Sequence, residues 1–324
     1  MKFTALFPGQ GSQQPGMGKA LFESETLARQ TFEEASDALS FDLKKLCFEG
    51  SESDLALTEN TQPALLTNSV ATVRVYQKKF GLNFGATAGH SIGEYSSFVL
   101  GGVIPFSTAI KAVRLRGKAM QNAVPVGKGG MAAVMGLEPD QVIQLCEMAT
   151  KDSKTGPISA ANFNAPGQIV ISGSALTLEW LGAQKIETFF PEVKRFKMIP
   201  LKVSAPFHCA LMQPAEDQMR DFFTPLQFEN SQLPILQNYH AKFETEAGKL
   251  KENLIRQVTG SVLWMQSMEA LKLAGMTTCI EFGSGKVLAG LLKKIDSESF
   301  KVFNTTSSED MKMLEDFLKN GVQT

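Results

Sequence analysis

The segment Gly89-His90-Ser91-Ile92-Gly93 constrains this chain more than any other, because it fits the G-x-S-x-G pattern of a nucleophile elbow. In such an elbow a buried strand ends in a sharp turn and a helix begins directly after it. The flanking sequence agrees, since Ala86-Thr87-Ala88 is typical of a strand end and residues 94–100 of a helix start. The segment therefore predicts that Ser91 directly follows the carboxyl end of a strand with its hydroxyl exposed, because the two glycines allow the sharp turn.

Strands and helices alternate along much of the rest of the chain. Residues 3–7 and 278–282 are typical of buried strands, and residues 62–80 and 286–295 of helices. Such alternation predicts an α/β fold with a mainly parallel sheet.

A middle segment, residues 127–203, has a different pattern. It predicts two successive units of strand, helix and strand, at 131–135, 139–150 and 158–161, then 168–172, 175–187 and 194–203. This order is typical of a ferredoxin-like α+β subdomain. We therefore expect a large core formed by residues 1–126 and 204–324, with residues 127–203 inserted as a small subdomain.

Composition narrows the possible partners and location. The 32 Lys and Arg residues nearly balance 33 Asp and Glu residues, so net charge favours neither a nucleic acid nor an anionic membrane as partner. Four scattered cysteines form no metal or disulfide pattern. No apolar run reaches the length of a membrane span, and the run at 3–7 is too short for a signal peptide. We expect a cytoplasmic protein with no metal and no cofactor.

A serine nucleophile needs a base, and the chain offers only three histidines, His90, His208 and His240. His90 adjoins Ser91, and successive residues of a tight turn point in different directions, so a structural role is favoured for it. His240 lies among polar, loop-like residues, which favours a solvated side chain. His208 follows Pro206 at a rigid corner, so elimination favours it as the base, while a purely structural core histidine is the open alternative.

Two backbone amides are candidates for an oxyanion hole. Ile92 N–H follows the serine at the helix start. Gln10 lies in the loop Pro8-Gly9-Gln10-Gly11 after the first strand, where glycines allow close approach to a ligand. A simple turn is the alternative for that loop.

Five motifs together carry a resemblance to a known family. They are Phe-Pro-Gly-Gln-Gly-Ser-Gln (7–13), Gly-His-Ser-Ile-Gly-Glu-Tyr (89–95), Leu-Arg-Gly-Lys (115–118), Pro-Phe-His (206–208) and Gly-Lys-Val-Leu (285–288). In this order and spacing, from about residue 3 to residue 305, the chain resembles the malonyl-CoA:acyl carrier protein transacylases of bacterial type II fatty acid synthesis.

The resemblance implies a hydrolase-like α/β core, and it implies a role for each matching residue. Ser91 matches the acylated nucleophile, and His208 matches its base, which carbonyl groups rather than a third carboxylate orient in this family. The amides of Gln10 and Ile92 match the oxyanion hole. Arg116 matches the arginine that binds the malonyl carboxylate. Gln257 matches a glutamine near the active site and is, with Arg116, a candidate substrate-binding residue.

Local charge is uneven within the neutral total. Residues 95–137 carry five basic and no acidic side chains, and residues 20–60 carry ten acidic and three basic ones. Lys194, Arg195 and Lys197 lie in a second basic stretch, where the resemblance places basic residues, and are candidates for the coenzyme A phosphates. A solvated strand edge protected by charge is the alternative for these three.

The resulting prediction is ping-pong transfer of malonyl from malonyl-CoA to acyl carrier protein, an acidic, transient partner, by a monomer. The main alternative is a serine hydrolase or thioesterase of the α/β-hydrolase type. The candidate triad acids Asp140, Asp152 and Glu179 lie within the predicted insertion, which disfavours it. A carrier-binding module with a dead site is also disfavoured, because the candidate catalytic residues are all present.

The chain departs from the family pattern at two loop positions. Ser261 and Ser284 each stand where a proline is usual. We expect local flexibility at both positions rather than lost chemistry.

Overall fold

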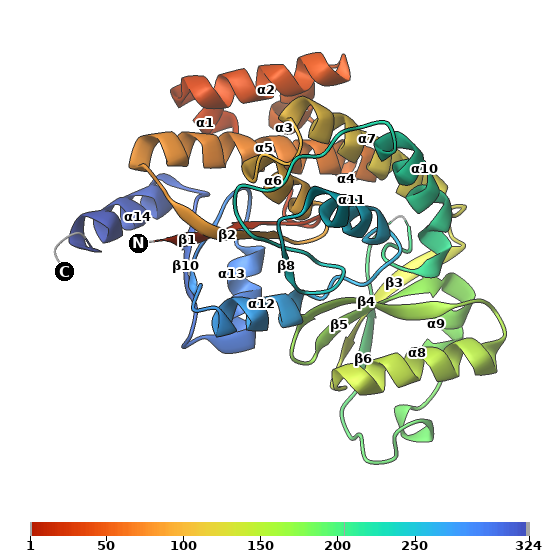
Figure 1. Cartoon of the computed structure of the whole chain (residues 1–324). Coiled ribbons are helices and arrows are strands. Elements are labelled where there is room, and N and C mark those ends of the chain that lie inside the picture. The colour runs from red at the N-terminus through yellow and green to blue at the C-terminus, as the bar shows by residue number, and fades with distance from the viewer. Residues whose placement is uncertain (1, 204, 322–324) are drawn as a thin grey trace.

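The computed structural model describes residues 2–203 and 205–321. Two separate sheets organise this part of the chain (Figure 1). Met1, residue 204 and residues 322–324 of the predicted large core lie outside the described residues. None of the described helices is long and apolar enough to cross a membrane.

The large sheet has six strands in the order β10-β9-β1-β2-β7-β8. All neighbours pair in parallel except β7 and β8, which are antiparallel. The strands are β1 (Phe3–Phe7), β2 (Phe84–Gly89), β7 (Ile235–Leu236), β8 (Phe243–Glu244), β9 (Thr278–Glu281) and β10 (Lys301–Asn304). The expected mainly parallel sheet is therefore confirmed.

Helices cover both faces of the large sheet, because alternate residues of a strand point to opposite faces. Phe3, Ala5 and Phe7 pack into the larger core, and Leu6 packs into the core on the other face. The larger core is built with α1 (Lys19–Ser24), α2 (Thr26–Leu39), α3 (Leu43–Glu49), α4 (Glu52–Ala56), α5 (Thr58–Phe80), α6 (Gly93–Leu100), α7 (Phe106–Asn122), α10 (Gln213–Phe223), α11 (Ala247–Arg256) and α14 (Ser308–Gly321). The opposite core is built with α12 (Trp264–Leu273) and α13 (Val287–Asp296).

The small sheet has four antiparallel strands in the order β4-β5-β3-β6. Along the chain its elements are β3 (Gly129–Met135), α8 (Pro139–Ser153), β4 (Ile158–Ala165), β5 (Gln168–Ser174), α9 (Ala175–Gly182) and β6 (Lys197–Pro200). With β3 as the first strand the spatial order is 4-1-3-2, the ferredoxin-like arrangement.

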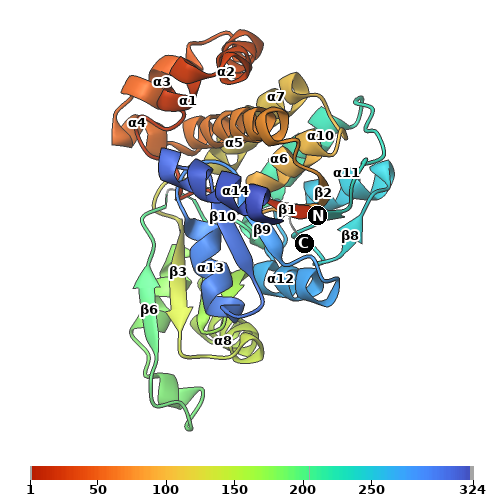
Figure 2. The same ribbon diagram turned by 90° about the vertical axis from the view of Figure 1, so that its left-hand side faces the viewer.

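The small sheet also has a hydrophobic core of its own, formed by residues between Ala132 and Val193. On this separate core we propose residues 127–203 as one structural unit and residues 1–126 with 204–324 as the other. Figure 2 shows the small sheet extending away from the large one.

Some expected boundaries were wrong. The expected helix 175–187 ends at Gly182, and the expected strand 194–203 is only Lys197–Pro200. The expected helix 62–80 begins earlier, at Thr58, so Pro63 lies inside it. Proline lacks the N–H that would bind the Glu59 carbonyl, and Arg114 Nη1 donates to that carbonyl instead, at 2.6 Å. This bond between α7 and α5 explains how α5 tolerates Pro63.

Candidate active site

The elbow between β2 and α6 holds Ser91 in a conformation that L-residues rarely adopt, with φ of 52°. Both flanking glycines are required sterically. A Cβ on Gly89 would lie 2.0 Å from the Gly93 carbonyl carbon, and a Cβ on Gly93 would lie 2.2 Å from the Phe7 oxygen. The predicted strand, turn and helix are therefore confirmed, with the strained geometry of a nucleophile elbow.

His208 is the histidine that lies against this serine. Its Nε2 is 2.7 Å from Ser91 Oγ, and its ring is buried. Its Nδ1 lies 2.9 Å from the Gln257 carbonyl oxygen and 3.2 Å from the Gly260 carbonyl oxygen. Because carbonyls only accept hydrogen bonds, Nδ1 carries the proton and Nε2 is left as the acceptor facing the serine hydroxyl.

Burial and the charge of Arg116 lower the pKa of His208 from 6.5 to about 3. Burial disfavours the charged imidazolium, and a nearby guanidinium adds electrostatic repulsion. The imidazole is therefore neutral at physiological pH, the state that can accept the Ser91 proton.

Arg116 extends from α7 to the same point and is 1% exposed. Its Nη2 donates to Ser91 Oγ at 3.2 Å and to Gln257 Oε1 at 3.0 Å. Its Nε has no hydrogen-bond partner within the described residues. A buried cation that donates to two neutral side chains, Ser91 and Gln257, can bind a ligand carboxylate through its planar fork.

Gln257 is completely buried and connects the three residues above. Besides its contacts with His208 and Arg116, its Nε2 donates to the Ser91 carbonyl oxygen at 3.0 Å and to Glu94 Oε2 at 2.7 Å. Gln257 is not among the residues that line the cavity at Ser91. Its contacts are those of a residue that supports the site from behind.

Sequence reasoning missed two buried residues behind the elbow. Glu94 also accepts hydrogen bonds from Asn238 N–H and Gln237 Nε2, and burial raises its pKa to about 7. Asn238 Oδ1 accepts from Ser91 N–H at 2.6 Å, and its Nδ2 donates to the Gly89 carbonyl at 2.7 Å. An acid directly after the elbow glycine was the available signal for Glu94, whereas Asn238 follows a two-residue strand that has no strong sequence signal.

A cavity of about 170 Å³ opens between the two sheets at Ser91. The large core contributes residues that include both oxyanion-hole candidates: Gln10, Gln62, His90, Ser91, Ile92, Arg116, Met120, Phe207 and His208. The small sheet and the chain after β6 contribute a mainly apolar wall: Met131, Asn162, Asn164, Val170, Leu201 and Val203. The structure therefore brings Ser91, His208, Arg116, Gln10 and Ile92 together around one cavity.

The other two histidines have structural contacts. His90 Nε2 lies 2.8 Å from Asn164 Oδ1, so it ties the elbow to the small sheet. His240 is half-buried, and its ring nitrogens lie within hydrogen-bonding distance of Lys242 N–H and Asn253 Nδ2. The expectation of a solvated His240 is met only in part, because its ring is partly exposed and also contacts Asn253 on α11.

Lys194, Arg195 and Lys197 lie outside the cavity wall, with exposed side chains. Lys197 pairs with Met135, four residues along β3 from the cavity residue Met131. Four residues of strand span about 13 Å. The described residues include no cluster of three or more His, Cys, Asp or Glu side chains that could hold a metal ion.

A strained serine at the carboxyl end of a sheet strand, in contact with a buried neutral histidine, defines the class of serine enzymes that act on acyl groups. The family model of the acyl transferase domain matches residues 4–256. The chain therefore belongs to the acyl transferase domain family, and it is an acyltransferase.

Individual relatives agree in sequence and structure. Malonyl CoA-acyl carrier protein transacylase of Bacillus subtilis (strain 168) is 41% identical over 295 residues, which cover 91% of this chain and 90% of the relative. The crystal structure of an acyl carrier protein S-malonyltransferase from Vibrio cholerae has a TM-score of 0.89 at 41% identity, covering 97% of this chain and 100% of that one. A malonyl-transacylase solved in complex with its type II PKS acyl-carrier protein has a TM-score of 0.90 at 39% identity, covering 98% of this chain and 100% of that one.

Proposed function

We propose that this enzyme transfers the malonyl group from malonyl-CoA to the phosphopantetheine thiol of acyl carrier protein. The observation that carries the proposal is the convergence of Ser91, His208 and the buried Arg116 on one cavity. A nucleophile and base account for acyl transfer, and the buried cation accounts for an acyl group that ends in a carboxylate.

In the first half-reaction Ser91 Oγ attacks the thioester carbonyl carbon as His208 Nε2 accepts the hydroxyl proton. The N–H groups of Gln10 and Ile92 stabilise the oxyanion. The carbon–sulfur bond then breaks, His208 returns the proton to the coenzyme A sulfur, and malonyl-Ser91 remains. Arg116 holds the malonyl carboxylate throughout.

In the second half-reaction the carrier thiol gives its proton to His208 and attacks the malonyl ester. The ester bond breaks, and Ser91 Oγ leaves with the proton from His208. Malonyl-carrier protein then departs to supply fatty acid chain elongation. Each step uses the same base in both directions, so the scheme requires no metal or cofactor.

Gln257 serves in this scheme as a support for all three residues rather than through direct contact with the substrate. Lys194, Arg195 and Lys197 stay candidates for the coenzyme A phosphates.

The proposed carrier is an acidic, transient partner. The basic stretches of the chain support it, and one relative was solved in complex with an acyl-carrier protein. The proposal includes a cytoplasmic monomer with no nucleic-acid or membrane partner, in keeping with a net charge of −1.

The test is to incubate purified protein with malonyl-CoA, with and without phosphopantetheinylated carrier protein, and to measure carrier mass and free malonate. We expect the carrier to gain one malonyl group, with little malonate. Hydrolysis of malonyl-CoA to free malonate, with the carrier left unmodified, would instead support the hydrolase alternative.

A further inference from the structure

The two carbonyl oxygens that accept from His208 Nδ1 belong to a short segment after α11, residues 257–261. The buried side chain of Gln257 anchors one end of this segment. Gly260 has no side chain, and it packs so closely that an added Cβ would lie 2.6 Å from the Tyr239 ring. The position of the Gly260 carbonyl therefore depends on the residues on either side of it.

Both neighbours of Gly260 carry hydroxyls that bind other parts of the fold. Thr259 Oγ1 donates to Glu216 Oε2 at 2.5 Å. Ser261 Oγ donates to the Ala160 carbonyl in β4 at 2.7 Å. The first contact reaches α10, the helix that begins five residues after His208.

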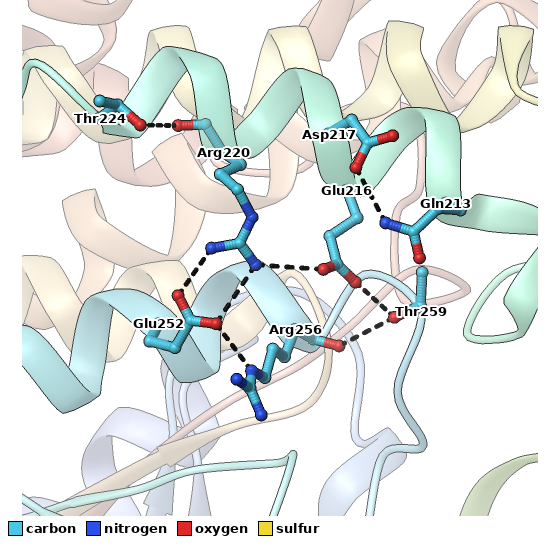
Figure 3. A network of polar contacts seen from close by, with 8 residues as sticks. All are labelled: Gln213, Glu216, Asp217, Arg220, Thr224, Glu252, Arg256 and Thr259. Carbon is cyan, nitrogen blue, oxygen red and sulfur yellow. Dashed lines mark hydrogen bonds and ion pairs between the residues drawn. The ribbon is translucent and has the colours of Figure 1, made fainter.

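Glu216 is 8% exposed and is itself held in place (Figure 3). Its Oε1 accepts from Arg220 Nη2 at 3.2 Å. Arg220 binds both oxygens of Glu252 on α11, at 2.8 and 3.2 Å, and Arg256 Nε donates to Glu252 at 2.7 Å. These contacts join α10 to α11 at the level of the 257–261 segment.

The contacts form a closed ring. His208 is joined through the chain to α10 and Glu216, Glu216 binds Thr259, and Thr259 precedes Gly260, whose carbonyl returns to His208 Nδ1. A closed ring restricts both the distance and the angle at the imidazole, because neither helix can shift without breaking one of its bonds.

We propose that Thr259 and Glu216 are positioning residues for His208. Their hydrogen bond fixes the Gly260 carbonyl, which keeps the proton on Nδ1 and directs Nε2 at Ser91 Oγ. The catalytic consequence of this inference rests on the proposed function, whereas the effect on the imidazole does not.

The test compares Thr259→Val, which removes the hydroxyl at nearly constant volume, with Thr259→Ser, which restores it. Thr224→Val is the matched control, because Thr224 is an exposed residue that caps the C-terminal end of α10, and its Oγ1 donates to the carbonyl of Arg220 four residues earlier. The first readout is the Nδ1–H signal of His208 in protein labelled with ¹⁵N-histidine, which is resolvable because the chain has three histidines. The second is the malonylation rate across pH.

We expect Thr259→Val to broaden the Nδ1–H signal by exchange and to lower kcat by about tenfold, because a misplaced base loses reactive geometry. KM should change by less than about twofold, since no substrate contact is removed. Thr259→Ser and Thr224→Val should behave like the wild type. A folded Thr259→Val with wild-type signal and kcat would overturn the proposal, as would an equal loss in Thr224→Val.

Two further comparisons keep the result interpretable. If Thr259→Val melts below the assay temperature, Glu216→Met, which removes the carboxylate acceptor at similar side-chain length, replaces it, and an unchanged Nδ1–H signal in that variant would overturn the proposal. If the wild type forms no malonyl adduct but Thr259→Val still loses the signal, the proposed function fails and the positioning role stands.

Discussion

His208 Nε2 lies 2.7 Å from Ser91 Oγ, although 117 residues separate the two in the chain. Both residues have positive φ, 52° for Ser91 and 58° for His208. Conformations of this kind persist only where the surrounding structure determines them. Here the elbow glycines fix the serine, and the carbonyls of Gln257 and Gly260 fix the imidazole, so nucleophile and base meet without rearrangement.

Arg116→Ala should reduce the preference for malonyl over acetyl groups by roughly 10- to 100-fold, the value of a lost hydrogen bond to a charged group. Competition between malonyl-CoA and acetyl-CoA, read as the ratio of the two acyl-enzymes, measures this preference. Lys118→Ala is the control on the same helix, since its side chain is 52% exposed and forms a surface ion pair with Glu59. An unchanged ratio in Arg116→Ala would remove Arg116 from selection of the acyl group.

The pH dependence of malonylation should report the charge of Arg116. With a pKa of about 3, His208 is already neutral in the wild type, so the rate should stay level from pH 8 to 5 and fall only in more acidic solution. Removing the positive charge in Arg116→Ala favours the imidazolium, so the pKa of His208 rises. On acidification, the variant should therefore begin to lose activity at a higher pH than the wild type. Stopped-flow release of coenzyme A across pH measures both curves. Coincident acid limbs would contradict this coupling.

Gly117→Ala should destabilise the protein by about 1–3 kcal/mol, the usual cost of overpacking. A Cβ at this position would lie 2.7 Å from both the Glu59 Cα and the Thr58 oxygen, so α7 would have to move away from α5. Gly290→Ala is the matched control, because, apart from the nearby backbone of its own helix, no atom of the described residues lies within 4 Å of its added Cβ. Urea unfolding should show a loss of stability in the first variant alone, and equal stability of the two would refute the packing argument.

Alanine at Lys194, Arg195 and Lys197 together should raise KM for malonyl-CoA if these residues bind the coenzyme phosphates. The expected change is several-fold and should diminish in high salt, because the side chains are exposed. A malonyl thioester of N-acetylcysteamine, which has no phosphate, serves as the comparison substrate. Equal effects on the two thioesters, or none on either, would favour the alternative of a solvated strand edge.

Local patterns predicted the parts of the fold that depend on local sequence. The elbow, the apolar strands β1 and β9 and the strand and helix order of the small sheet all leave periodic signals within short windows. Helix and strand ends were less predictable, as at Pro63, because the compensating donor, Arg114, lies 55 residues from Glu59.

Apart from Gln257, which the family resemblance placed near the site, the support of the site was not predictable from local patterns, because it depends on contacts between distant segments. Glu94 binds both Asn238 and Gln257, each more than 140 residues away in the chain. The surroundings of the two serines that replace prolines were likewise not predictable from local sequence. Ser261 forms a specific bond to Ala160, and Ser284 is 3% exposed, its hydroxyl lacking a partner among the described residues.

Intact-mass measurement of the purified protein after brief exposure to malonyl-CoA tests the central claim most directly. The wild type should gain the mass of one malonyl group, peptide mapping should place that group on Ser91, and Ser91→Ala should gain none. The adduct should disappear when phosphopantetheinylated carrier protein is added, as the carrier gains the same mass. A malonyl adduct that persists in Ser91→Ala, or a wild type that transfers malonyl without forming one, would contradict the account.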